Sequence, residues 1–421
     1  MNVLRLHLRT SPLRWAVLPL AAGALLILLI RPRYWIGSWP ETGAAAQVSA
    51  FFLSILAAAA ASWVSGSVRR HGMGEQLAAA SLRRSRMEWR RFAVTAALLL
   101  APYLAGHVAA FVITARDFPP GLGLWAGYLL MGLVVMLFAI GWGWLIGRYL
   151  APVYAALVAA LSWVVFETFP AEAAYLGVLD GPPWLQPDVR SLIVRAAAVA
   201  LLIGALVLLP PRPVRRGPDW GAAVVSGSAL LVAMVATVTT TGVSERAVPA
   251  EPYCVAGRME ICLWPENRKY TPVVQEIDGR AATLPPVWQT PPRLLEYGLK
   301  RQVVKYRGRT FTQLEGDFQF SEGNKWALAL GASEAIINES LKQCDWDRVR
   351  AAEDSTPEAL RKWVELYLAN SATPPYQTID ASESMRKAWA TATDVFTGMS
   401  APQQDQWVSR QFATVRAEYC G

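Results

Sequence analysis

Seven long apolar runs occupy the first 242 residues, and they constrain the fold more than any other feature of the chain. A helix rises about 1.5 Å per residue, so crossing the hydrocarbon core of a bilayer takes about 20 residues. Backbone groups exposed to lipid must be hydrogen-bonded within the spanning structure itself, and a helix achieves this alone. The predicted spans are residues 14–30, 44–65, 92–115, 122–147, 150–166, 191–209 and 220–242. We therefore expect an α-helical polytopic membrane domain of about seven transmembrane helices over residues 1–242.

The chemistry of the chain changes near residue 242. No lysine precedes that point, whereas all seven lysines follow it. The first part has nineteen arginines and nine acidic residues, and the second has 21 basic and 23 acidic residues. Residues 243–421 are therefore predicted to form a separate water-soluble domain. Excess positive charge can indicate nucleic-acid binding, but here it lies in loops between predicted spans, so we expect no nucleic-acid partner.

The arginines also predict the orientation in the membrane. With the N-terminus in the cytoplasm, the inner loops contain 14 arginines, whereas the outer loops and adjoining span ends contain five. The positive-inside rule favours this arrangement over its inverse, so we expect a multi-pass protein of the plasma membrane with residues 243–421 outside the cell. The first apolar run could instead be a cleaved signal peptide. It is long, however, and no small-residue cleavage site follows it, so we expect a retained span.

Every cysteine of the chain lies in the predicted external domain, at Cys254, Cys262, Cys344 and Cys420. An even number of cysteines outside the cell favours two disulfides over four reduced, buried thiols. Three pairings are open, of which we prefer Cys254–Cys262 with Cys344–Cys420. The first would close a short hairpin near Gly257, and the second would join the ends of helices predicted over residues 324–343 and 402–419.

The rest of the external domain is predicted to be helix-rich α+β. Residues 359–369 place Leu360, Trp363, Val364 and Tyr367 on one helical face. Residues 302–305 and 310–313 alternate as a pair of strands would. We therefore expect an independent hydrophobic core in this domain.

The external domain offers no recognisable catalytic site. The three histidines, His7, His71 and His107, all precede it, which excludes Ser-His-Asp sites and His-ligated zinc there. The cysteines lack CxxC spacing, so no metal site is expected. Ser384 and Lys387 match an S-x-x-K pattern whose companion motifs are missing, which favours a chance match. We therefore expect neither enzymatic activity nor a cofactor, and a membrane-tethered enzyme is the least favoured alternative.

Three ionisable residues in the predicted spans are candidates for an intramembrane polar site. They are His107, Glu167 and Arg195, and such residues are costly in lipid and often functional. His107 is expected either to pack against a neighbouring helix or to line a substrate path. Glu167 and Arg195 lie near the outer ends of successive spans, where they could pair with each other or each reach water.

The loop between the second and third predicted spans, residues 67–91, carries seven arginines. Within it, Arg69-Arg70-His71-Gly72-Met73-Gly74-Glu75-Gln76-Leu77 resembles the corresponding loop of ABC-2 type transporter permeases. In that family an Arg-x-x-Gly-x-x-Glu-x-Leu run forms a coupling element that docks on an ATPase. The resemblance extends over the basic N-terminal stretch, the first six spans and an extracellular insertion between the fifth and sixth. The seventh span and the external domain depart from it, and this combination resembles actinobacterial permease-like proteins.

The resemblance implies the membrane subunit of an ABC-2 exporter, forming a homodimer or pairing with a sister permease. Because the chain has no phosphate-binding loop, the ABC ATPase subunits would be separate polypeptides. The coupling residues that the resemblance implies are Arg70, Gly72, Glu75, Leu77, Leu82, Arg83 and Arg84. The rival prediction is a non-transporting membrane anchor whose external domain senses or binds a ligand.

Overall fold

The computed structural model describes residues 8–30, 32–70, 84–169, 181–209, 220–306, 309–320, 324–345, 356–373 and 382–420. The chain divides into two compact units, Met1–Arg246 and Ala247–Gly421. The division lies four residues after the boundary predicted from composition. We call these the membrane unit and the second unit and describe each by itself.

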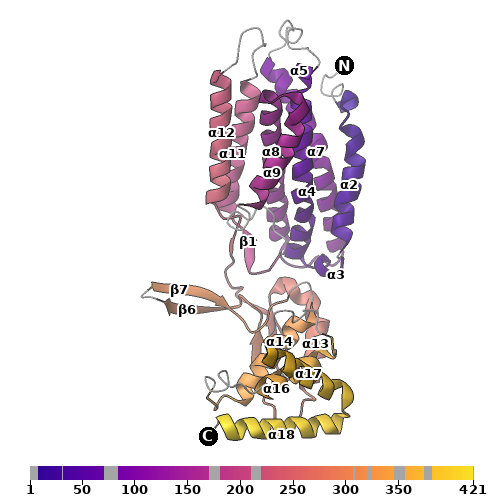
Figure 1. Cartoon of the computed structure of the whole chain (residues 1–421), viewed down its shortest axis with the longest axis vertical. Coiled ribbons are helices and arrows are strands. Elements are labelled where there is room, and N and C mark those ends of the chain that lie inside the picture. Colours follow the sequence, from indigo (N-terminus) through magenta and orange to yellow (C-terminus); the bar gives the residue numbers. More distant parts are fainter. Residues whose placement is uncertain are drawn as a thin grey trace. The chain divides into compact units, whose positions relative to one another are not determined.

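Apolar helices make up the membrane unit (Figure 1). Among the described residues, five are long and apolar enough to cross a membrane, namely α4 (Trp39–Ser65), α7 (Arg84–Thr114), α8 (Leu122–Tyr149), α11 (Val189–Leu208) and α12 (Trp220–Thr239). The remaining two predicted spans correspond to shorter apolar helices, α2 (Arg14–Leu29) and α9 (Pro152–Thr168), of 16 and 17 residues. Each apolar run thus forms a helix, and five of the seven helices have the length that spanning requires.

Short elements connect these helices. Among the described residues these include α3 (Pro32–Trp35), α5 (Ser67–Arg70), and the strands β1 (Leu185–Pro187) and β2 (Val243–Glu245). The two strands pair antiparallel. Asp188 begins α11 as its N-cap, because its carboxylate accepts a hydrogen bond from the Ser191 amide.

Small residues bring α4 and α8 into close contact. Gly143 and Gly147 lie one turn apart on α8 and face the backbones of Ala58 and Ser62 on α4. At both glycines an added Cβ would collide with the facing carbonyl oxygen. Small residues at such positions let helix backbones pack together in lipid, where van der Waals contact contributes much of the association energy.

Replacing Gly143 should therefore weaken the membrane unit. We expect Gly143→Ala to cost about 1–3 kcal/mol, because the methyl group meets backbone that cannot rotate away. Gly227→Ala in α12 is the matched control, since nothing lies within 4 Å of its added Cβ. That change should be neutral or stabilising, because alanine favours a helix by about 1 kcal/mol over glycine. Thermal unfolding of the detergent-purified protein checks both variants, and equal melting temperatures would contradict close α4–α8 packing.

The second unit contains strands and helices, as predicted. One sheet has the order β3 (Tyr253–Val255), β4 (Glu260–Leu263) and β5 (Arg293–Leu295). In it, β3 and β4 are antiparallel, whereas β4 and β5 are parallel. The strands β6 (Lys300–Tyr306) and β7 (Arg309–Glu315) form an antiparallel hairpin (Figure 1). This hairpin contains the predicted strand pair over residues 302–305 and 310–313.

The helices of the second unit surround a hydrophobic core of their own. In the described part of this unit they are the 3₁₀ helix η2 (Pro265–Tyr270) and the α-helices α13 (Thr271–Ala281), α14 (Lys325–Ser340), α16 (Thr356–Ala369), α17 (Glu383–Gly398) and α18 (Ala401–Tyr419). Leu360, Trp363 and Val364 of α16 are fully buried in this core, and Tyr367 packs against its margin. The predicted apolar face of this helix is confirmed.

Two disulfides cross-link the second unit in the preferred pairing. Cys254 and Cys262 lie directly opposite each other on β3 and β4 and are bonded. Cys344, just after α14, is bonded to Cys420, just after α18. Glu260 approaches the first pair in a geometry that could suit a metal ion, but both sulfurs are already used by the disulfide.

Candidate functional site

Most of the predicted coupling loop lies outside the described residues. This holds for Gly72, Glu75, Leu77, Leu82 and Arg83, so their coupling roles stay predictions. Of the remaining two, Arg84 begins α7 and Arg70 ends α5. The described helices therefore define where the loop leaves the bundle and where it returns.

Arg70 is held against α4. Its Nη2 donates to the backbone oxygen of Trp63 at 2.8 Å. Its guanidinium also lies over the Trp63 ring, 3.6 Å from the centroid. A cation over an indole face is a stabilising contact. In this structure Arg70 thus stabilises the end of α4.

Where the basic loop rejoins the bundle, a charged cluster is present that sequence analysis did not identify. Its members are Glu88 and Arg91 of α7 with Trp144 and Arg148 of α8, and we call it the Glu88 cluster. Glu88 Oε1 accepts from Arg148 Nη2 at 2.9 Å and from Trp144 Nε1 at 3.0 Å, and Oε2 accepts from Arg91 Nη1 at 3.1 Å. The side chains of Glu88, Arg91 and Arg148 are only 12%, 13% and 2% exposed. Charges with so little access to water depend on one another and on the surrounding hydrogen bonds.

Arg148 also binds the end of α11. Its Nη2 donates to the Leu206 oxygen at 2.6 Å and its Nη1 to the Leu209 oxygen at 3.1 Å. The last carbonyl groups of a helix lack partners within it and form the negative end of its dipole. A guanidinium placed there satisfies the carbonyl groups and offsets the dipole. The cluster therefore joins α8 to α11.

Arg91 binds the end of α4 in a similar way. Its Nη2 donates to the Val64 oxygen at 2.9 Å and to Ser67 Oγ at 3.1 Å. Ser65 Oγ adds a further link by donating to the Trp144 oxygen at 2.7 Å. Through these contacts, the first turns of α7 are connected to the C-terminal ends of three helices, α4, α8 and α11.

His107 lies in an aromatic environment within α7. It is 1% exposed, and its ring centroid lies 4.6 Å from that of Tyr103 and 6.0 Å from that of Trp125. Neither ring nitrogen has a hydrogen-bond partner among the described residues. These are aromatic packing contacts without a hydrogen bond to a neighbouring helix, and a role in a substrate path stays a prediction.

Glu167 and Arg195 have separate surroundings, and both sequence-based alternatives for them are wrong. Glu167 Oε2 accepts from Ser54 Oγ at 3.0 Å, while Arg195 Nε donates to Thr240 Oγ1 at 3.0 Å. No ion pair joins these two described residues, and at 1% and 3% exposure neither reaches water. The physical reason is that each has a nearer partner, a serine of α4 for the acid and the C-terminal end of α12 for the cation. The three predicted intramembrane residues therefore have three different sets of neighbours.

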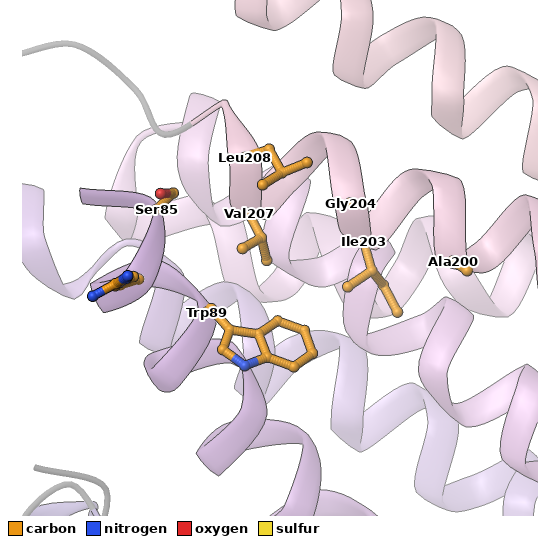
Figure 2. A pocket seen from close by; sticks show the side chains of 8 residues that line it. Ser85, Trp89, Ala200, Ile203, Gly204, Val207 and Leu208 are labelled. Atoms are coloured by element: carbon orange, nitrogen blue, oxygen red, sulfur yellow. The ribbon is translucent and has the colours of Figure 1, made fainter. Parts of the chain in front are cut away.

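A cleft of about 560 Å³ opens between α7 and α11 (Figure 2). Its lining residues are Ser85, Arg86, Trp89, Ala200, Ile203, Gly204, Val207 and Leu208. The two most polar members come from the first turn of α7, and the others are mostly apolar. Local sequence patterns do not predict this cleft, because its two walls are more than a hundred residues apart in the chain.

No protein-family model, curated protein or solved structure matches this chain.

Proposed function

We propose that this chain is the membrane subunit of an ABC-2 type exporter, driven by separate ATPase subunits that dock on the basic loop. The observation that carries the proposal is the Glu88 cluster. It lies where α7 leaves that loop and connects α7 to the ends of α4, α8 and α11. Burying charged groups is expensive. A cluster that binds α7 to the ends of three other helices is suited to transmitting a displacement of the loop to the bundle.

Mechanical coupling is the role that this arrangement suits. An ATPase that moved the loop would displace the first turns of α7. Because Glu88 is held by Arg91 and Arg148, that displacement would reach the three attached helix ends together. Packed helices respond to such a displacement by small discrete shifts rather than by continuous deformation. A path for the exported substrate would then open between two copies of the subunit or between it and a sister permease.

The proposed orientation has the N-terminus and the basic loop in the cytoplasm. The distribution of arginines supports this, and the Glu88 cluster lies at the same end of the bundle as the basic loop. The disulfides of the second unit fit an oxidising compartment, which supports placing that unit outside the cell. In this arrangement the second unit is an extracellular accessory domain.

Co-purification with candidate ATPase subunits tests the docking step. We expect wild type to retain an ATPase in detergent, and both Glu75→Arg and Leu77→Asp to lower its recovery at least tenfold. Asp405→Asn in α18 of the second unit is the control and should leave recovery unchanged. The absence of association in wild type, or equal recovery in all variants, would contradict docking through the loop. That outcome would favour the rival function, a membrane anchor with an external binding domain.

A further inference from the structure

We propose that the cleft between α7 and α11 binds one anionic glycerophospholipid of the cytoplasmic leaflet. An acyl chain would lie along α11, and the phosphate would lie beside Ser85 and Arg86. The inference uses the membrane orientation proposed above but does not depend on transport or on an ATPase.

The apolar part of the cleft has the form of a shallow trough. Ala200, Gly204 and Leu208 follow one another at four-residue spacing, and Ile203 and Val207 do the same, so all five share one side of α11. Gly204 keeps this surface open, since an added Cβ there would meet nothing within 4 Å. From residue 200 to residue 208 the helix rises about 12 Å, a length suited to part of an acyl chain.

Trp89 forms the opposite side of the trough. Its side chain is 53% exposed, and its ring lines the same cleft as Ile203 and Val207 (Figure 2). Tryptophan is enriched at the boundary between hydrocarbon and headgroups, because its ring is apolar and its N–H is polar. This position suits the place where the headgroup of a lipid meets its tail.

Positive charge is concentrated at one end of the trough. Ser85 and Arg86 come from the start of the described part of α7 and line the cleft at this end. Arg86 is exposed and makes no ion pair with any described residue. The carbonyl groups at the end of α11 would repel a phosphate, but Arg148 already donates to those of Leu206 and Leu209. The field at this end therefore favours an anion.

A lipid fits these features better than other occupants. The volume of the cleft is in the range of small-molecule sites, about 300–1,000 Å³. A partner helix with its side chains is about 10–12 Å across, which is wide for a cleft of this volume. Free phosphate would leave the apolar floor uncovered. An amphiphile with an anionic head matches both parts, and basic pockets between spans on the cytoplasmic side suit such headgroups.

Lipid titration of the purified full-length protein tests the site, with native mass spectrometry as the readout. Wild type should bind phosphatidylglycerol at least fivefold more tightly than phosphatidylcholine, and inorganic phosphate should not compete. We expect Arg86→Gln to abolish the preference, and Gly204→Leu to weaken both lipids at least fivefold by filling the trough. Arg90→Gln, a neighbouring arginine that does not line the cleft, and Gly227→Leu, at an open site on α12, are the matched controls.

Three outcomes would overturn the proposal. They are equal binding of the two lipids by wild type, unchanged binding by Gly204→Leu, and a switch from dimer to monomer in Gly204→Leu, which would mean that a second copy covers the cleft. Size-exclusion profiles and melting temperatures establish that each variant is folded. If Gly204→Leu does not fold, Ala200→Leu fills the other end of the same row of lining residues and carries the same expectation.

Discussion

Glu88→Ala is expected to destabilise the membrane unit by about 3–5 kcal/mol, the usual cost of removing one partner from a buried ion pair. The substitution leaves the Arg148 guanidinium, 2% exposed, without a counter-charge. It also removes the acceptor for Trp144 Nε1 and for Arg91 Nη1. Unfolding the detergent-purified protein with heat or denaturant measures this loss of stability. A change below about 1 kcal/mol would mean that the cluster is hydrated and behaves like a surface ion pair.

A pair of further variants separates stability from coupling. Glu88→Gln keeps an acceptor oxygen but removes the charge, so it should lose less stability than Glu88→Ala. The double variant Glu88→Leu with Arg148→Met replaces the pair by apolar groups, a change that is often neutral or stabilising. We expect this double variant to fold and to retain the ATPase. Its docked ATPase should hydrolyse ATP several-fold more slowly than the wild-type complex, because α7 would no longer hold the end of α11. An unchanged rate would assign the cluster a purely structural role.

Local patterns were sufficient to predict the apolar helices of the membrane unit and several elements of the second unit. Apolar runs of this length favour a helix over a strand, and each of the seven runs contains one. The two disulfides were also within reach, because strand alternation brings Cys254 opposite Cys262, and helix ends place Cys344 and Cys420. Such signals need only a short stretch of chain.

Contacts between distant segments were not within reach of these patterns. Glu88 looks like one more charge in a basic loop, and only the fold brings it to Arg148, sixty residues later. Its spacing of three from Arg91 was the one available signal. The predicted pairing of Glu167 with Arg195 was wrong for a different reason. Opposite charges in successive spans suggest an ion pair. In the structure, however, Glu167 is bound by the Ser54 hydroxyl group and Arg195 by that of Thr240.

Removing the Cys344–Cys420 disulfide is expected to destabilise the second unit by about 4–5 kcal/mol. The bond closes a loop with a sequence separation of 76, and the chain-entropy relation gives about that value for such a length. Cys254–Cys262, with a separation of eight, is the matched comparison and should contribute about 2–3 kcal/mol. The variants are the paired serine replacements at each disulfide. Hydrogen exchange of the α14 and α18 amides in the full chain measures the effect within the second unit.

The test of this explanation is whether removing Cys344–Cys420 costs more stability than removing Cys254–Cys262. Phe412 and Val415 of α18 are buried in the core, so we expect the helix to keep apolar contacts that favour its native position when the bond is removed. The loss at Cys344–Cys420 therefore reflects the freedom gained by the unfolded chain. Equal losses for the two disulfides would contradict this explanation.

The same cysteines also test the orientation, because a membrane-impermeant thiol reagent should label them in intact cells only after reduction. Labelling only in opened cells would place the second unit in the cytoplasm and contradict the proposed export function.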